Sequence, residues 1–386
     1  MAFSPLFGAM FDDRVETAKH LESDLSAIEK WAKKWIVSFS PQKTKSLLIS
    51  TKRDAHHNPG VQFMDSIIDE VENHKYLGLI FSNNLKWNTH IDTVCLKARK
   101  RLSVIQPLKF KLNRKSLETM YFSYILPVLE YGSVVWGGSC DVNISKLEKI
   151  HVDAMRLVTG ATAGSNIHRL YTETGWLSVR SRIDNAMVIM LYKVRNELVP
   201  NYLCEILEPH YAEQIHYRLR NDNDIKLPFT RREAFRRSFF PSAIRLWNKL
   251  RPNERNAPSV SDLKMLLKKE SVEKSILYYY GKRWASVHHA RLRMQCSKLN
   301  YDLCCKLYVL DNPSCRCGEA RETAFHYFLR CPLYNNIRDT LFNTVNEHTA
   351  CNINTLLFGD PTLSIDVNKT IFDAVHSFIH DSERFI

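Results

Sequence analysis

Glycine and proline are scarce in this chain of 386 residues, which contains 12 Gly and 14 Pro. Collagen-like and low-complexity chains are excluded, because their glycine and proline contents are far higher. The sequence has no internal repeat, so repeat architectures are not expected either. With 45% hydrophobic and 25% charged residues, it has the profile of a folded protein. Since single cores stop growing at roughly 250 to 300 residues, we expect about two or three modules.

Long apolar runs are also lacking. The most apolar internal stretch, residues 121–136, is interrupted by Glu130, whereas a membrane span needs roughly 20 apolar residues in succession. The apolar N-terminus has no basic residue before it and no small-residue cleavage site, unlike a secretory signal. Ten cysteines at irregular spacing in such a chain are typical of a reducing compartment. We therefore expect an intracellular protein of the nucleus or cytoplasm, with no membrane partner.

Acidic residues are too few to balance the basic ones, since 54 Lys and Arg against 41 Asp and Glu leave a net charge of +13. Residues 215–300 alone hold 20 basic and 7 acidic side chains, which equals the whole excess. A local excess of this kind releases counterions from a phosphate backbone and favours RNA or DNA as the partner. The alternative is a basic face that only keeps the protein in solution.

Hydrophobic periodicity predicts an α+β fold that is predominantly α-helical. Apolar residues at steps of three and four indicate an amphipathic helix over residues 14–36, with Asp13 as its N-terminal cap. Three short apolar runs predict a small antiparallel sheet near the N-terminus; they lie at 46–51, 61–68 and 76–82. Helical spacing then returns and predicts a helical bundle; its expected helices lie at 87–101, 114–136, 145–160 and 176–197.

Three cysteines and a histidine near the C-terminus have the spacing of a metal site, C-x-C-x8-H-x4-C; they are Cys315, Cys317, His326 and Cys331. Two thiolates on a turn with glycine, and a His/Cys pair on a helix that ends near Pro332, can surround one tetrahedral zinc ion. Four protein ligands leave no place for water, so this Zn²⁺ would be structural. The alternatives are an accidental spacing of thiols, or a ligand swap with the adjacent Cys304 or Cys305.

Arginines and aromatic residues alternate between residues 229 and 250. Arginines on successive turns can contact phosphates while rings stack on unpaired bases, at roughly 1 to 3 kcal/mol per base. The candidate contacts are Arg231, Arg232, Arg236 and Arg237, together with a second cluster of Lys282, Arg283, Arg291 and Arg293. The alternative is a core helix with inward aromatics, which we favour for Phe240 and Trp247.

Six segments form an ordered set along the chain. They are KWIVSFSPQKTKSLLIS, HKYLGLIFSNNLKWNTHI, YILPVLEYGSVVWGG, KLEKIHVDAMRLVTGA, FRRSFFPSAIRLWNKL and the cysteine cluster. Together they resemble the C-terminal portion of the reverse transcriptases of non-LTR retrotransposons, the LINE and jockey-like elements. The resemblance covers the chain from about residue 12 to its end, and each segment alone would be weak.

The resemblance implies four modules. Residues 1–110 would form the palm edge, a primer-grip-like hairpin and the first thumb helix, and residues 111–212 a helical thumb-like bundle. Residues 213–300 would be the basic nucleic-acid-binding segment, and residues 301–386 a zinc knuckle. It also implies that Lys43, with Lys45 as the alternative, helps to protonate the leaving pyrophosphate. Tyr76 and Gly78 would belong to the hairpin that grips the primer end, where glycine lets the backbone approach closely.

Polymerisation needs two magnesium ions held by carboxylates. Phe11, Asp12 and Asp13 have the form of the family's aromatic-x-Asp-Asp signature, but capping of a helix accounts for Asp13. We therefore expect a nucleic-acid-binding fragment that is inactive alone, with Mg²⁺ only in a full-length parent enzyme. The alternatives are a truncated gene model of an active reverse transcriptase and a non-catalytic interaction scaffold derived from one. No protein partner is indicated by the sequence.

Overall fold

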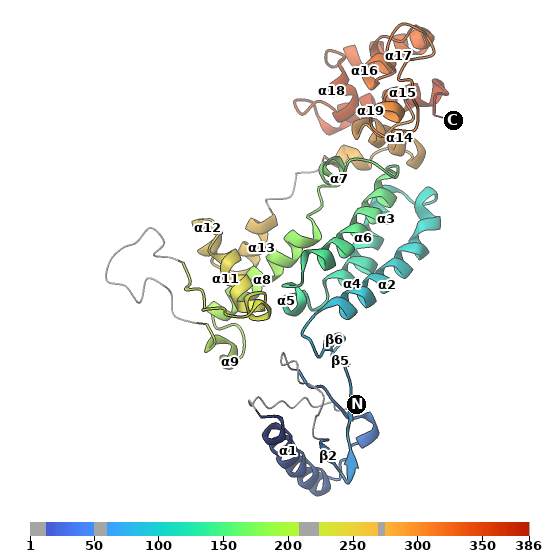
Figure 1. Ribbon diagram of the computed structural model, residues 1–386. Coiled ribbons are helices and arrows are strands. Elements are labelled where there is room, and N and C mark those ends of the chain that lie inside the picture. Colours follow the sequence, from blue (N-terminus) through green and yellow to red (C-terminus); the bar gives the residue numbers. More distant parts are fainter. Residues whose placement is uncertain (1–12, 50–59, 208–223, 269–274, 386) are drawn as a thin grey trace. The chain divides into compact units, whose positions relative to one another are not determined.

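The computed structural model describes residues 13–49, 60–207, 224–268 and 275–385. The chain forms two compact units, Met1–Thr93 and Val94–Ile386, and each is described by itself. Helices predominate and the sheets are small (Figure 1), which confirms the predicted predominantly helical class. The division into four modules stays a prediction.

The first unit begins with helix α1 (Arg14–Trp35), which confirms the helix expected at 14–36. The Asp13 carboxylate accepts a hydrogen bond from the backbone N–H of Val15 at 2.9 Å and so caps the helix. One face of α1 is buried at Ala18, which packs with Val61 and Phe63 in a small core. Asp13 therefore has a structural role as an N-cap, while residues 11 and 12 lie outside the described residues.

The predicted single antiparallel sheet is wrong in its pairing. The described strands form three separate two-stranded sheets; they are β1 (Lys45–Ser46), β2 (Gln62–Phe63), β3 (Ser66–Ile67), β4 (Asp69–Glu70), β5 (Asn73–Tyr76) and β6 (Leu79–Ser82). β1 pairs with β4 in parallel, while β2–β3 and β5–β6 are antiparallel hairpins. The run at 61–68 folds back on itself because Met64 and Asp65 adopt positive φ angles of 49° and 60°. Residues 50 and 51 of the first predicted strand lie outside the described residues.

Helix α2 (Asn88–Ile105) begins in the first unit and continues in the second. The helices that follow it as far as residue 268 are α3 (Arg114–Met120), α4 (Leu126–Glu130), α5 (Ser133–Trp136), α6 (Asp141–Thr159), α7 (Ile167–Thr174), α8 (Val179–Arg195), α9 (Asn201–Cys204), α10 (Glu233–Arg236), α11 (Phe239–Trp247), α12 (Pro252–Arg255) and α13 (Val260–Lys268). α2, α6 and α8 confirm three of the predicted helices. The fourth, at 114–136, is helical from Arg114 to Glu130, with a π-helical segment, Tyr121–Ile125, next to Pro127, which lacks an N–H donor. A turn at Tyr131 and Gly132 then separates it from α5.

The C-terminal helices of the second unit share a hydrophobic core that includes Leu299, Phe328 and Phe372. They are α14 (Arg283–Arg293), α15 (Asn300–Cys305), α16 (Ala324–Leu329), α17 (Asn335–Asn346), α18 (Ile353–Phe358) and α19 (Ile365–Asp381). α19 packs against both α14 and α17. Among the helices that the structure describes, none combines the length and apolar character needed to cross a membrane.

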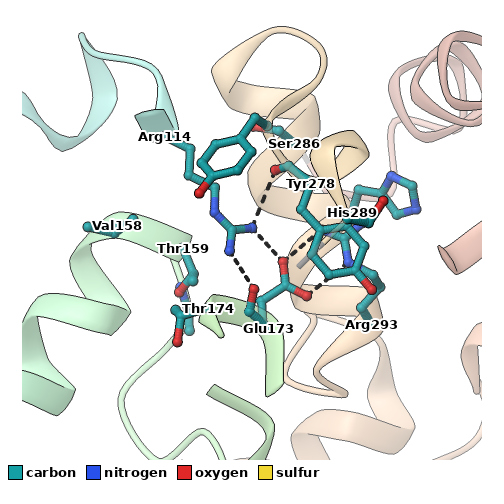
Figure 2. A network of polar contacts seen from close by, with 12 residues as sticks. Arg114, Val158, Thr159, Glu173, Thr174, Tyr278, Ser286, His289 and Arg293 are labelled. Carbon is teal, nitrogen blue, oxygen red and sulfur yellow. Dashed lines mark hydrogen bonds and ion pairs between the residues drawn. The ribbon is translucent and has the colours of Figure 1, made fainter. Parts of the chain in front are cut away.

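A buried ion-pair network joins α14 to the helical bundle (Figure 2). Glu173, near the end of α7, accepts hydrogen bonds from Arg114 of α3 at 2.6 Å and from Arg293 of α14 at 2.8 and 3.0 Å. Arg293 also lies over the ring of Tyr278, 4.2 Å from its centroid. Because buried charges are costly unless they are paired, this network fixes where α14 meets α3 and α7.

Candidate metal centre and basic surface

The four predicted metal ligands lie together. The ligand atoms of Cys315, Cys317, His326 and Cys331 are all within 4.8 Å of one another. The sulfurs of Cys315 and Cys331 are 3.6 Å apart, and the Cys317 sulfur is 3.3 Å from Nε2 of His326. Tetrahedral zinc, with bonds of about 2.3 Å to sulfur and 2.0 Å to nitrogen, would separate two sulfurs by about 3.8 Å and sulfur from nitrogen by about 3.5 Å. The cluster thus fits one zinc ion.

A tight hairpin presents the first two cysteines. The backbone N–H of Cys315 donates to the carbonyl oxygen of Ala320 at 2.8 Å, and the N–H of Gly318 donates back to Cys315 at 3.0 Å. Gly318 has a φ angle of 81°, which glycine adopts without the strain that a side chain would add. The Gly-containing turn that the sequence predicts is therefore present, and it directs two sulfurs toward one point.

Helix α16 presents the other two ligands. Thr323 caps the helix by accepting from the backbone N–H of His326 at 3.1 Å. The helix ends at Leu329, before Pro332 as predicted, and the N–H of Cys331 then donates to the His326 carbonyl oxygen at 2.8 Å. This turn brings Cys331 back beside His326, although a spacing of five residues would separate them on a continuous helix.

Arg338 of α17 supports this turn from behind. Its buried guanidinium donates to the carbonyl oxygen of Phe328 at 2.8 Å and to that of Cys331. Both carbonyls lie at the end of α16, where helix geometry leaves acceptors without internal donors. Arg338 is thus a positioning residue that sequence spacing alone did not identify.

The electrostatics of the cluster favour a bound cation. Burial raises the pKa of the Cys331 thiol to about 12 and also raises the pKa of Cys315. The backbone N–H of Glu319 has the opposite effect and lowers the pKa of Cys317. Metal ligation requires thiolates, and a dication supplies the positive charge that buried thiolates lack.

The other cysteines stay outside the cluster. All ten cysteines of the chain are free thiols. Cys304 lies with its sulfur 3.6 Å from the carbonyl oxygen of Asp311, and neither it nor Cys305 is part of the only four-residue ligand group found among the described residues. The ligand swap left open by the sequence finds no support in this geometry.

Most side chains of the second predicted cluster of nucleic-acid contacts form hydrogen bonds or ion pairs within the protein. Arg293 is buried in its ion pair with Glu173. Arg283 donates to the carbonyl oxygens of Lys109, Leu157 and Val158, and Arg291 donates to that of Gly160 at 2.7 Å. The bonds to residues 157, 158 and 160 cap the C-terminal end of α6, so both arginines hold α14 against α6. Only Lys282, directly before α14, is exposed.

The first predicted cluster reaches solvent, since Arg231, Arg232, Arg236 and Arg237 are all exposed. Glu233 forms ion pairs with Arg236 at 2.7 Å and Arg237 at 2.5 Å, and the hydrogen bond from Arg236 lowers its pKa to about 2. Trp247 is fully buried, as favoured for a core position, whereas Phe240, for which the same position was favoured, is half-buried.

The arginine segment lies close to the bundle. A β-carbon on Gly138, between α5 and α6, would be 1.6 Å from the carbonyl oxygen of Arg237. That separation is far below any contact distance, so only glycine permits this approach.

A further basic surface was missed by the sequence analysis. Residues 96–115, from α2 into α3, contain no acidic residue, and five of their basic side chains are exposed; these are Lys97, Arg99, Lys100, Lys111 and Lys115. Arg101 from the same stretch lies 4.5 Å from the ring centroid of Tyr124, an exposed aromatic. The signal was available in the sequence as a run of basic residues without acids, but a net count over longer windows dilutes it.

The predicted residues of the first unit lie in short elements. Lys43 is exposed at the end of a 3₁₀ turn, Pro41–Lys43, while Lys45 pairs with Asp69 at 2.6 Å. Tyr76 ends β5, and Gly78 lies in the turn to β6 with a φ angle of 85°. The predicted hairpin residues are therefore at a true hairpin turn, which requires positive φ.

No protein-family model matches the chain. It is 27% identical over 163 residues to the "Probable RNA-directed DNA polymerase from transposon BS" of Drosophila melanogaster, covering 40% of this chain and 18% of that protein. It is 28% identical over 151 residues to the "RNA-directed DNA polymerase from mobile element jockey" of Drosophila funebris, covering 38% and 16%. A probable polymerase from the X-element of D. melanogaster is 23% identical over 146 residues, covering 36% and 16%.

These matches span less than a fifth of the length of each relative. They agree with the family resemblance that the sequence analysis identified, over less of the chain than the sequence analysis expected. Over about two fifths of its length, this chain is similar to the RNA-directed DNA polymerases of jockey-type mobile elements.

Proposed function

We propose that this chain binds RNA or DNA through exposed cations and is a non-catalytic part of a reverse transcriptase of the non-LTR type. The observation that carries the proposal is the acid-free basic stretch at 96–115, which has five exposed cations and in which Arg101 lies over the ring of the exposed Tyr124. Cations there can neutralise phosphates, and Phe122 and Tyr124 can stack on bases. The similarity to RNA-directed DNA polymerases supports the same conclusion.

The exposed arginines in α10 and directly before it would supply further phosphate contacts. Arg231 and Arg232 precede the helix, and the ion pairs of Glu233 offset part of the charge of Arg236 and Arg237. Lys43 and the Tyr76–Gly78 hairpin would contribute in the first unit. Arg283, Arg291 and Arg293 keep their structural roles in this proposal.

The second part of the proposal is that this chain alone does not join nucleotides. Support comes from Asp13, whose carboxylate is engaged as the N-cap of α1 rather than placed on a strand hairpin. The zinc ion would be structural, since Cys315, Cys317, His326 and Cys331 fill four positions. Free thiols throughout the chain fit a reducing, intracellular compartment, nuclear or cytoplasmic.

The test is the salt dependence of binding. The full chain would be titrated into fluorescent single-stranded RNA, and the logarithm of affinity plotted against the logarithm of salt concentration. We expect a slope near −3 or steeper, because each neutralised phosphate of a single strand contributes about −0.7. A flat plot, or no binding at low salt, would contradict the proposal and favour an interaction scaffold.

A further inference from the structure

A pocket of about 260 Å³ lies in the second unit, away from the metal cluster. Three segments line it: the loop before α7, the end of α14 and the turn after α15. The lining side chains that matter for binding are Ser165, Asn166, Arg169, Lys306, Leu307 and Tyr308. Neither the basic surface described above nor the zinc cluster includes any of them.

Two cations and a helix end give this pocket a preference for anions. Arg169 donates once, to the carbonyl oxygen of Met294 at 3.2 Å, and its other N–H groups contact no polar atom of the described residues. Lys306 is exposed and forms no ion pair there. Asn166 caps α7, whose first N–H groups carry the positive end of the helix dipole.

Ser165 supplies an independent sign of a ligand. Its side chain is only 4% exposed, and its Oγ has no hydrogen-bond partner among the described residues. A buried hydroxyl without a partner costs about 1 to 3 kcal/mol. Ser165 lines the pocket. Its Oγ is shielded from solvent, so rotation of the side chain about the Cα–Cβ bond would let the hydroxyl donate to a phosphate oxygen bound there.

Other groups around the pocket limit what can bind. Asp302 is a nearby carboxylate that interacts electrostatically with both Arg169 and Lys306; it is buried and accepts from the N–H of Ser297 at 3.1 Å and from its hydroxyl. The two pocket cations therefore outnumber it. Tyr308 is 85% exposed and offers an aromatic face at the same pocket, while Leu307 adds an apolar wall. The volume suits one nucleotide and excludes a duplex.

We propose that this pocket binds a single unpaired nucleotide, with its phosphate at Arg169, Lys306 and Ser165 and its base against Tyr308. The nucleotide could be free, or it could belong to a strand held by the basic surface, and only the second source rests on the function proposed above.

Isothermal titration of the full, zinc-loaded chain with 5′-AMP tests this inference. We expect one site, with adenosine failing to bind because it lacks the phosphate. Ser165→Ala and Lys306→Ala should each weaken 5′-AMP binding about tenfold, whereas Lys369→Ala, which removes the same charge from α19, should not. Ser165→Ala should unfold at a urea concentration equal to or higher than that of the parent chain, since it removes a buried hydroxyl that makes no bond within the described fold.

The two sources separate in a second titration. A 5′-phosphorylated single strand that competes with 5′-AMP, and loses affinity in Ser165→Ala, would place a strand in the pocket; if 5′-AMP alone responds to the variants, the ligand is a free nucleotide. No binding of 5′-AMP, or equal binding by all variants, overturns the inference. If the proposed binding of RNA or DNA were wrong, the result would be different, because the parent chain would then bind no single strand at all.

Discussion

Arg293 of α14 donates hydrogen bonds to both carboxylate oxygens of Glu173 of α7, at 2.8 and 3.0 Å, and both side chains are 3% exposed. Burial alone would raise the pKa of Glu173, but the guanidiniums of Arg293 and Arg114 hold it below its usual value. The carboxylate thus stays ionised and joins the helical bundle to the C-terminal helices.

Glu173→Gln should destabilise the chain by about 3 to 5 kcal/mol, because it leaves two buried guanidiniums without a counter-charge. Urea unfolding followed by circular dichroism would measure this loss. Glu347→Gln, at an exposed position after α17, serves as the control and should change little. Equal stability of both variants would show that the network contributes no net stabilisation.

Loss of zinc should follow from a single ligand change. We expect about one equivalent of zinc in the purified chain, and its loss in Cys331→Ser, because three ligands and a hydroxyl bind the ion weakly. Elemental analysis would measure the metal, and hydrogen exchange should show opening mainly beyond residue 300. Cys304→Ser is the matched control and should keep its zinc; a parent chain without zinc contradicts the site.

Acid should weaken the fold before its carboxylates protonate. Burial lowers the pKa of His151 to about 3 and those of His288 and His376 to about 4, and it also lowers the pKa of His289. The unfolded chain takes up these protons below its ordinary pKa of about 6.5. Stability is therefore fully present above that pH and falls toward pH 4, by about 1.4 kcal/mol per pH unit for each histidine.

Urea unfolding at pH 7 and pH 5 would test this prediction. At pH 5, His376→Gln should reduce the number of protons taken up on unfolding by about one, since one histidine that is neutral in the folded chain and protonated in the unfolded chain is removed. Asn343→Gln, at an exposed site on α17 and without a titrating group, is the control. A parent chain equally stable at both pH values would contradict the assignment of neutral buried histidines.

Removal of the missed basic surface should lower the salt dependence of RNA binding. The fourfold variant Lys97→Ala, Lys100→Ala, Lys111→Ala and Lys115→Ala should reduce the magnitude of the slope by about 3, at roughly 0.7 for each phosphate that is no longer neutralised. Lys33→Ala, whose ammonium pairs with Glu29 at 2.7 Å, is the control. An unchanged slope would place the phosphate-binding cations elsewhere, with the arginines before α10 as the next candidates.

The chain alone should fail to extend a primer. We expect no product from an RNA template with magnesium and nucleotides, because Asp13 is committed to capping α1. An active reverse transcriptase in the same assay is the positive control. Robust extension by this chain, abolished by Asp13→Asn, would show that the capping role is not the whole role of Asp13.

The helices and the metal ligands could be predicted from sequence because their signals are local. The periodicity of α6 and the spacing around His326 are both set within a few residues. The strands could not, since a short apolar run gives no sign of a reversal such as that at Met64 and Asp65. Which arginines are buried and which are exposed could not be predicted either. Arg293 and Arg231 have the same side chain and differ only in that Arg293 forms an ion pair with Glu173, which is distant in the sequence.

The position of the arginine segment, residues 231–237, depends on Gly138, a residue outside that segment. Any β-carbon at this position would collide with the carbonyl oxygen of Arg237. The presence of glycine here in a related sequence therefore indicates that the arginine segment keeps this position. A related sequence that has lost the glycine must hold its arginines somewhere else, however well the arginines themselves survive. In related sequences, the residue at this position therefore indicates whether the arginines before and in α10 can occupy the place that they have here.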